Sequence, residues 1–361
     1  MHSFTGGDDG ATPYSPLLLG KVGNLYGTTW MGGAYGNGVV FKLDSSGNET
    51  VLHAFGALPD AQNPFFGGLI KDKEGNLYGT TCCGGTGGRG DGTVFEITNA
   101  GEEKILYNFQ GAPGDGDGPN GGLTRDSAGN FYGVTYLGGQ YSWGTVWQLS
   151  ASGAETVLYS FAGTPDGADP YAETLVRDSA GNLYGTNYYD AEYGWGSIFE
   201  ISPTGKETIL YDFPGAPGAY LAYSGLIEGK DGDFYGVTEG GGTANPPYGY
   251  GTIYKISRSG KFTLLYSFQG PPDDGREPFG ELVRDKAGNL YGTTIQGGKS
   301  DDGTVFKLDT TGHETVLHSF SGSDGAEPFA PVILDSKGNL YGTARQGGAD
   351  NYGVVFRLTP K

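Results

Sequence analysis

One phrase dominates the sequence, because a version of "GNLYGTT" occurs seven times along the chain. The tyrosines of the seven copies are spaced 52, 54, 52, 51, 56 and 50 residues apart: Tyr26, Tyr78, Tyr132, Tyr184, Tyr235, Tyr291 and Tyr341. A regular period of this length is typical of folds in which every repeat forms one supersecondary unit. The period therefore constrains the fold more than any other feature.

Each unit contains four short segments with strand character, bounded by turn residues. In the second unit these are "GGLIKD", "NLYGTTC", "GTVFEIT" and "EKILYNF". Tight Asp- and Gly-containing turns join the first segment to the second and the third to the fourth, whereas the other two connections are long. Four antiparallel strands repeated seven times predict an all-β fold, a seven-bladed β-propeller with both long loops on one face. That long-loop face is the predicted working face.

The two ends of the chain predict how the ring closes. Six units finish with a fourth strand such as "VLHAF", but the last unit, which contains residues 331–361, stops after its third strand in "GVVFRLTPK". The N-terminal "MHSF", residues 1–4, supplies the missing strand and removes the open edges of a linear array. We therefore expect residues 1–361 to form a single domain, with Met1 at a trimmed start inside a longer precursor.

The residues shared by the units resemble a named bacterial repeat, the Gloeobacter/Verrucomicrobia tandem repeat. The pattern "GNLYGTT…GG…GTVF…G…T.LHSF.G.DG..P" marks that family, and all seven units show most of it. The resemblance covers essentially the whole chain and implies an exported or surface-attached bacterial protein. It implies little about activity, so the site is argued from residues.

Charge and composition narrow the choice of partner. The formal net charge is −19 in 361 residues, and such a surface repels phosphate backbones and anionic lipid. No apolar run reaches the length that spans a bilayer. We therefore expect neither nucleic acid nor membrane insertion, and a monomer that binds a neutral oligosaccharide or polysaccharide.

The histidines give no sign of a metal or a catalytic triad on the long-loop face. They occupy a fourth-strand position that other units fill with tyrosine, except for His313 in a tight hairpin: His2, His53 and His318 alternate there with Tyr107, Tyr159, Tyr211 and Tyr266. No metal site and no cofactor are therefore expected.

Calcium at the acidic loops is the alternative that this expectation leaves open. The loops "DGDGP" (115–119), "DGADP" (166–170), "DGREP" (274–278) and "DGAEP" (324–328) place two acids near a proline. Because these loops recur in several units, a structural role in the turns is favoured for their acids over calcium binding. The vicinal Cys82 and Cys83 are expected to be reduced, with a vicinal disulfide as the alternative.

We expect a functional site at the positions where the seven units have different residues. The position after "YGTT", where the second strand enters the long-loop face, reads Trp30, Cys82, Tyr136, Tyr188, Glu239, Ile295 and Arg345. At the start of the first strand, Glu173 and Glu281 stand among small residues. Glu239, Glu281 and Glu173 are therefore the candidate catalytic carboxylates, each with a solvated rim charge as the alternative.

Aromatic residues crowd the loops between second and third strands. Flat amphipathic rings can stack on sugars, which makes Trp30, Tyr136 and Tyr188 candidate platforms, with Arg345 as a hydrogen-bonding partner. Trp143 and Trp195 share one position before "GT" and "GS", so stacking on a ligand and packing between blades both stay open for them.

Three classes of function fit these observations. The first is binding of a neutral glycan at the mouth, and the second is its hydrolysis there by paired carboxylates. A polysaccharide lyase with a tyrosine base and Arg345 as neutraliser is a variant that the acidic surface disfavours. The third class is a non-catalytic protein-interaction scaffold, a common role of propellers.

Overall fold

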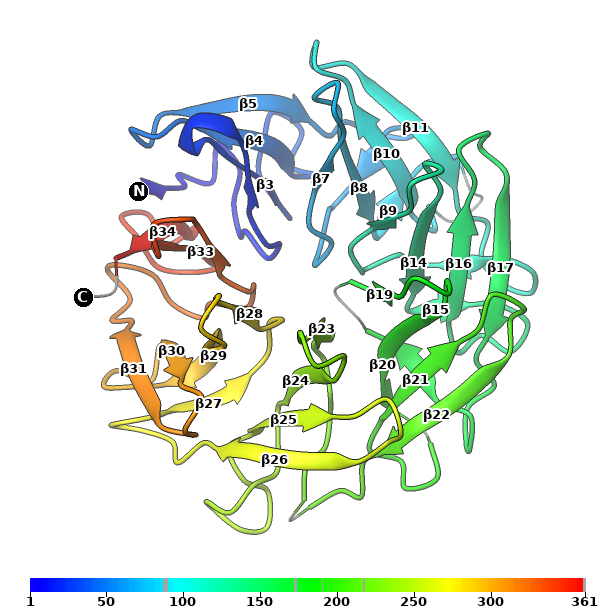
Figure 1. The fold of residues 1–361 in the computed structure, drawn as a ribbon. Coiled ribbons are helices and arrows are strands. Elements are labelled where there is room, and N and C mark those ends of the chain that lie inside the picture. Colours follow the sequence, from blue (N-terminus) through cyan, green and yellow to red (C-terminus); the bar gives the residue numbers. More distant parts are fainter. Residues whose placement is uncertain (87–89, 172–173, 190, 217, 360–361) are drawn as a thin grey trace.

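The computed structural model describes residues 1–361 except 87–89, 172–173, 190, 217 and 360–361. Its strands form seven four-stranded antiparallel sheets that radiate from a central axis (Figure 1). The predicted seven-bladed β-propeller is confirmed. In the described part of the chain the only helical segment is a short 3₁₀ turn, η1 (Lys21–Gly23), and no helix there is long and apolar enough to cross a membrane.

Within each blade the strands follow one another from the axis outward. The first strands are β2 (Leu18–Leu19), β7 (Ile70–Lys71), β13 (Thr124–Arg125), β19 (Val176–Arg177), β23 (Ile227–Glu228), β28 (Val283–Arg284) and β32 (Ile333–Leu334). The second strands are β3 (Leu25–Thr29), β8 (Leu77–Thr81), β14 (Phe131–Thr135), β20 (Leu183–Tyr189), β24 (Phe234–Thr238), β29 (Leu290–Gly297) and β33 (Leu340–Ala344). The third strands are β4 (Val39–Leu43), β10 (Thr93–Ile97), β16 (Thr145–Leu149), β21 (Ser197–Ile201), β25 (Thr252–Ile256), β30 (Thr304–Leu308) and β34 (Val354–Leu358).

The fourth strands form the outer rim of the ring. They are β5 (Glu49–Ala54), β11 (Glu103–Asn108), β17 (Glu155–Ser160), β22 (Glu207–Asp212), β26 (Phe262–Ser267), β31 (Glu314–Ser319) and, for the seventh blade, β1 (His2–Ser3). Short strands in the long loops add local ladders: β6 (Ala61–Gln62) with β9 (Cys83–Gly84), β12 (Gly116–Asp117) with β15 (Leu137–Gly138), β18 (Ala168–Pro170) with β20, and β27 (Gly275–Pro278) with β29.

The ring closes by a strand from the N-terminus. β1 pairs antiparallel with β34 in the register His2↔Val355 and Ser3↔Val354, so the N-terminal strand lies beside the last strand of the chain (Figure 1). Phe4, which follows β1, is fully buried and meets the ring of Phe41 edge-on at 5.3 Å. The seventh blade is therefore fastened to the first by main-chain hydrogen bonds and by a core aromatic.

The tyrosine of the repeated phrase packs between blades, as in the cluster that joins Tyr26 and Val40 to Leu69 and Phe95 of the next blade. The sequence predicts a backbone partner for its hydroxyl, and that detail is wrong. In six blades the hydroxyl donates to an aspartate side chain of the neighbouring tight turn, as from Tyr78 to Asp72 at 2.8 Å. The aspartate of the turn also accepts hydrogen bonds from the backbone N–H and the side-chain amide of the following Asn. These bonds orient the carboxylate so that one oxygen lies within reach of the tyrosine hydroxyl.

The second glycine of the phrase leaves space for the neighbouring strand. A Cβ atom on Gly79 would lie 2.7 Å from the ring of Phe95, and one on Gly133 would lie 2.5 Å from that of Trp147. In each blade an aromatic ring of the third strand therefore packs directly against this glycine of the second strand. The phrase thus builds the blade, and the ligand-facing residues must lie elsewhere.

Candidate functional site

The long-loop face carries a belt of aromatic side chains around the axis. They come from one position in each blade, directly after the proline or its equivalent in the loop from the fourth strand to the next blade: Tyr14, Phe65, Tyr171, Tyr223, Phe279 and Phe329, with Asn120 in the third unit. Neighbouring rings of this belt are 4.8–5.3 Å apart between centroids. The belt therefore forms an aromatic floor at the mouth of the ring, interrupted at Asn120 of the third unit.

Phe66 plugs the centre of the belt. Its ring lies 5.4–6.4 Å from the rings of Tyr171, Phe279 and Phe329, and 5.5 Å from that of Tyr14. Only 4% of Phe66 is exposed. A ligand at the mouth would therefore rest on this floor, outside the central channel.

The residue before the proline has a left-handed backbone in every blade. The φ angles lie between 53° and 63° at Thr12, Asn63, Gly118, Asp169, Leu221, Glu277 and Glu327. In the seventh blade the N–H of Glu327 donates to the carbonyl of Asp302, and its carbonyl accepts from the N–H of Arg345. The loop is thus tied to both neighbouring blades, and the side chain of this residue is held at the rim of the floor.

A pocket of about 250 Å³ opens at the mouth, over the fifth, sixth and seventh blades. Its lining combines three carboxylates and one guanidinium with aromatic and other side chains: Tyr223, Glu239, Glu277, Phe279, Ile295, Gln296, Glu327, Phe329 and Arg345. With every group ionised, three negative charges and one positive charge give this pocket a net charge of −2.

Two of the carboxylates have perturbed acidities. Burial, and then the negative charge of Glu277, raise the pKa of Glu239 to about 7. Burial also raises the pKa of Glu277, although the charge of Arg276 acts against this rise. Glu239 therefore holds a proton near neutral pH more readily than an exposed glutamate does.

The third carboxylate is neutralised within the pocket. The guanidinium of Arg345 donates through Nε to Glu327, forms a second close contact to it through Nη2, and donates through Nη1 to the hydroxyl of Tyr14. The same guanidinium lies over the ring of Phe329 at 4.6 Å. Arg345 therefore pairs with Glu327 and helps to hold the floor.

The structure brings several of the predicted residues to the mouth. Glu239 and Arg345 line the pocket, and Tyr188 stacks on Tyr223 of the floor with 3.9 Å between centroids. Tyr136 meets Tyr171 edge-on at 5.5 Å, and Trp30 lies 5.6 Å from Phe65 on the far side of the belt.

Glu281 lies apart from this pocket. Its Oε1 atom is buried, and a Cβ atom on Gly225 would lie 2.0 Å from it, so the carboxylate sits beside the innermost strands of the fifth and sixth blades. Burial raises the pKa of Glu281 to about 8. The pocket at the mouth brings Glu239 together with Glu277, and its lining does not include Glu281. Glu173, the other candidate, lies outside the described residues.

Trp143 and Trp195 pack on glycines of the neighbouring loops. A Cβ atom on Gly163 would lie 3.2 Å from the indole of Trp143, and one on Gly215 would lie 2.4 Å from that of Trp195. About 40% of each tryptophan is exposed. Both side chains lie outside the pocket lining, so packing between loops accounts for their shared position in the repeat.

Sequence reasoning missed the floor and two of the pocket carboxylates. The signal for the floor is the aromatic residue that follows the loop proline in most units, as in "DGREPF" and "DGAEPF". The two acids of each such loop have separate tasks. Asp274 accepts hydrogen bonds from the N–H groups of Gln269 and Gly275 and from the Tyr266 hydroxyl, whereas Glu277 reaches the pocket.

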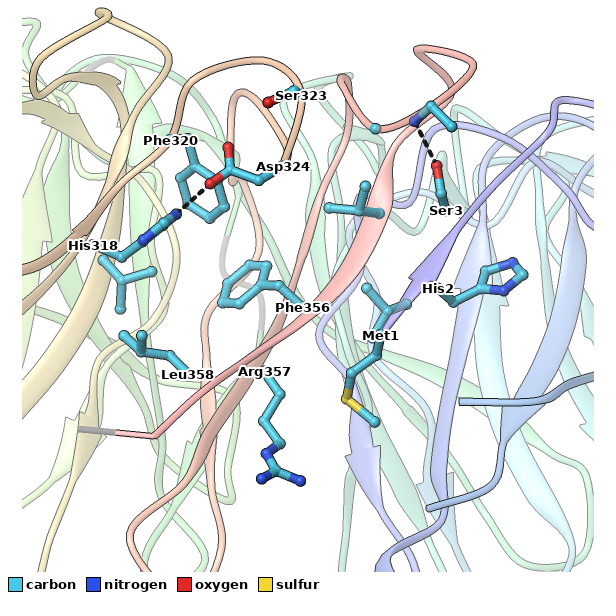
Figure 2. Close-up of a pocket in the computed structure, with 15 residues that line it drawn as sticks. Met1, His2, Ser3, His318, Phe320, Ser323, Asp324, Phe356, Arg357 and Leu358 are labelled. Carbon is cyan, nitrogen blue, oxygen red and sulfur yellow. Dashed lines mark hydrogen bonds and ion pairs between the residues drawn. The ribbon is translucent and has the colours of Figure 1, made fainter. Parts of the chain in front are cut away.

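A larger hollow of about 570 Å³ lies at the outer edge of the seventh blade (Figure 2). It follows from the short β1, which pairs with only two residues of the five-residue β34. Met1, Phe356 and Leu358 line it. Its lining combines β34 with residues of the sixth blade such as Val305 and His318, and Asp324 is the one carboxylate among the lining residues.

These features define a seven-bladed β-propeller with an acidic, aromatic-floored pocket at its mouth. The chain belongs to the Gloeobacter/Verrucomicrobia repeat family, whose model matches residues 1–127, 68–270 and 244–361. A comparison with curated proteins finds no match to this sequence.

Solved structures with a similar fold share little sequence with this chain. A streptogramin B lyase superposes with a TM-score of 0.61 at 16% identity, covering 97% of this chain and 94% of its own. The extracellular domain of a putative one-component system from B. thetaiotaomicron gives 0.61 at 12% identity, covering 96% and 38%. A putative 6-phosphogluconolactonase from Bacteroides fragilis gives 0.55 at 19% identity, covering 93% of each chain. At these identities the likeness concerns the fold alone.

Proposed function

We propose that the protein binds a neutral saccharide in the pocket at the mouth and hydrolyses a glycosidic bond there. The observation that carries this proposal is the placement of Glu239 beside Glu277 above the aromatic floor, with the pKa of Glu239 raised to about 7. Glycoside hydrolysis uses one carboxyl that holds a proton and a second that is ionised. Aromatic rings at the base of the pocket supply the surface on which a sugar ring stacks.

The residues divide the chemical work as follows. Glu239 donates its proton to the leaving glycosidic oxygen, and Glu277, which lies 3.5 Å from a guanidinium nitrogen of Arg276, takes a proton from the attacking water. The bond between the anomeric carbon and that oxygen breaks while the water oxygen bonds to the anomeric carbon. Glu327 is paired with Arg345, so Glu239 and Glu277 are the two carboxyls left for the chemistry.

The geometry favours hydrolysis over a lyase reaction. A lyase needs a free cation to neutralise the substrate carboxylate, and the guanidinium of Arg345 is already engaged by Glu327 and Tyr14. Three carboxylates around the pocket would also repel an anionic polysaccharide. Export from the cell, which the family resemblance implies, is part of this proposal, and fractionation of the native host checks it.

The test is a panel of neutral oligosaccharides assayed for binding and for new reducing ends. We expect Glu239→Gln to bind with similar affinity but to lose at least about 100-fold in cleavage rate, the usual scale for a general acid. Glu74→Gln, which removes an exposed carboxylate from a tight hairpin on the opposite face, is the matched control. Cleavage that survives Glu239→Gln would overturn the catalytic assignment, and neither binding nor cleavage across the panel would favour the scaffold role.

Glycine at a left-handed pocket residue should separate stability from activity. The φ of Glu277 is 58°, a conformation that costs a non-glycine residue about 1–2 kcal/mol. The third blade already uses Gly118 at the equivalent position with a φ of 63°. We therefore expect Glu277→Gly to unfold at an unchanged or slightly higher temperature while cleavage is lost.

Glu277→Gln is the control for that experiment, since it removes the charge and keeps the strained backbone. Thermal unfolding and the reducing-end assay are measured on both variants. A marked drop in the melting temperature of Glu277→Gly would show that contacts of the carboxylate stabilise the loop by more than the backbone strain costs.

A further inference from the structure

The outer rim repeats one three-residue junction between neighbouring blades. Its members are the His or Tyr of a fourth strand, the first Asp of the loop that follows, and the Glu that begins the fourth strand of the next blade. The described junctions with all three members are His2–Asp9–Glu49, His53–Asp60–Glu103, Tyr107–Asp115–Glu155, Tyr159–Asp166–Glu207 and Tyr266–Asp274–Glu314. None of them belongs to the pocket at the mouth.

At the three junctions that contain tyrosine, the tyrosine hydroxyl donates a hydrogen bond to the aspartate. Tyr107 and Tyr266 each donate to the aspartate at 2.8 Å. Tyr159 donates to Asp166 and lies 3.2 Å from Glu207. A hydrogen bond therefore joins the ring residue to a carboxylate at each of these three junctions.

At the two junctions that contain His2 and His53, the imidazole Nε2 makes no hydrogen bond to a described residue. His2 Nε2 lies 3.6 Å from Asp9 and 3.7 Å from Glu49, and His53 Nε2 lies 3.8 Å from Asp60 and 3.9 Å from Glu103. Both Nε2 atoms are buried and lack a hydrogen-bond partner among the described residues, as does one oxygen of each glutamate. The side chain of Glu49 is only 10% exposed. Three donor atoms thus face one small space at each junction, within 4.8 Å of one another.

The ligand groups are already oriented by their surroundings. Asp9 accepts hydrogen bonds from the N–H and hydroxyl of Thr5, and Asp60 accepts from the N–H groups of Gly56 and Ala61. The imidazole of His2 meets the ring of Phe4 edge-on at 4.8 Å, and that of His53 meets Phe55 at 5.0 Å. Little side-chain freedom is left to lose when a cation binds.

We propose that His2–Asp9–Glu49 and His53–Asp60–Glu103 each bind one divalent cation of the first transition series, for which zinc is the best fit. One imidazole nitrogen and two carboxylate oxygens are zinc ligands, with a fourth position open to water. Zinc bonds of about 2.0–2.2 Å hold tetrahedral ligand atoms about 3.4 Å apart. The histidine-to-carboxylate distances of 3.6–3.9 Å therefore need only a few tenths of an ångström of closure, and the two carboxylate oxygens lie within 4.8 Å of each other.

The two junctions lie on either side of the first blade. At one junction, His2 belongs to the strand that closes the seventh blade, and Glu49 begins β5 of the first blade. At the other, His53 lies near the end of β5, and Glu103 begins β11 of the second blade. A cation at each would cross-link the seventh, first and second blades where the ring is fastened. The sequence predicts no metal site, because it places no histidine on the long-loop face. The proposed sites are instead at the outer rim.

His318 provides a natural control. It lies 2.9 Å from Asp324 (Figure 2), and among the described residues no third ligand group completes that pair. Tyrosine is the matched replacement, because three other junctions use it with a hydroxyl that reaches the aspartate. His2→Tyr and His53→Tyr should therefore fold and lose only the metal.

The experiment titrates ZnCl₂ alone into untagged, EDTA-stripped protein by calorimetry, with thermal unfolding as the second readout. We expect two zinc ions per chain for the parent and for His318→Tyr, one for His53→Tyr, and none for the double variant His2→Tyr/His53→Tyr. Zinc should raise the melting temperature of the parent by several degrees and leave that of the double variant unchanged. Failure of the parent to bind zinc, or a stoichiometry that the tyrosine variants do not change, would overturn the proposal.

Discussion

Metal-free protein should lose stability steadily as the pH rises from 5 to 9. Three of the glutamates responsible lie in the tyrosine junctions of the outer rim, where a glutamate is buried near an aspartate. Burial raises the pKa of Glu49, Glu103, Glu239 and Glu281 in the same direction. Burial is the main cause that raises the pKa of Glu155 to about 7, that of Glu207 to about 9 and that of Glu314 to about 8. The nearby charges of Asp115, Asp166 and Asp274 add to these shifts.

The direction follows from proton counting. Each glutamate titrates near 4.5 in the unfolded chain and at a higher pH in the folded one, so the folded state binds more protons between these values. Its contribution to stability is complete below about pH 4.5 and is lost as the pH rises through 7, 8 and 9. One pKa unit corresponds to about 1.4 kcal/mol, and partial solvation of the rim reduces this. We expect each glutamate to contribute about 1–2 kcal/mol to the free energy of unfolding at low pH, which is lost at high pH.

The measurement is the melting temperature from pH 5 to pH 9 in the presence of EDTA. The triple variant Glu155→Gln/Glu207→Gln/Glu314→Gln keeps the shape of the protonated side chains, and we expect its melting temperature to fall less steeply with pH than that of the parent. Net charge also grows more negative with pH, so the control replaces three exposed glutamates, Glu74, Glu102 and Glu192, with glutamine. A triple rim variant as steep as the parent would show that these junctions do not set the pH dependence.

The repeat made most of the fold predictable. A 50- to 56-residue period with two tight turns per unit admits few topologies, and the incomplete last unit points to closure by residues 1–4. Strand pairing and tight turns are local or periodic, so one sequence shows them directly. The fold, the closing strand and the aspartate turns follow from such signals.

The site could be predicted only in part, because it depends on contacts between blades. Glu239 and Arg345 were found as departures from the repeat at one position. Glu277 was hidden among the acids of a recurrent turn, since only the folded loop shows that Asp274 serves the turn and Glu277 the pocket. The histidines are informative only beside Glu49 and Glu103 of the next blade. A single unit read by itself carries no such information.

Replacing Phe66 with alanine should produce the largest loss of stability among single changes at the mouth. Only the second and fourth units have one extra residue between the belt position and the first strand, and this residue is Phe66 in the second unit and Ala172 in the fourth. One large ring therefore fills the space that seven blades leave at the axis. It contacts rings from the first, fourth, sixth and seventh blades, so its loss would leave a cavity that no single loop can close.

Truncation of a buried phenylalanine costs about 3–5 kcal/mol when the surroundings cannot collapse. We expect Phe66→Ala to fall in this range, measured as a shift of the denaturant midpoint at constant slope. Phe65→Ala is the matched control because Phe65 is adjacent in sequence, belongs to the same belt and is only partly buried, and it should cost less than half as much. Because Phe279 and Phe329 both lean on Phe66 and line the pocket, Phe66→Ala should also weaken saccharide binding without touching the ligand. A loss below about 1 kcal/mol would mean that the belt closes around the smaller side chain, and the floor would then not depend on its plug.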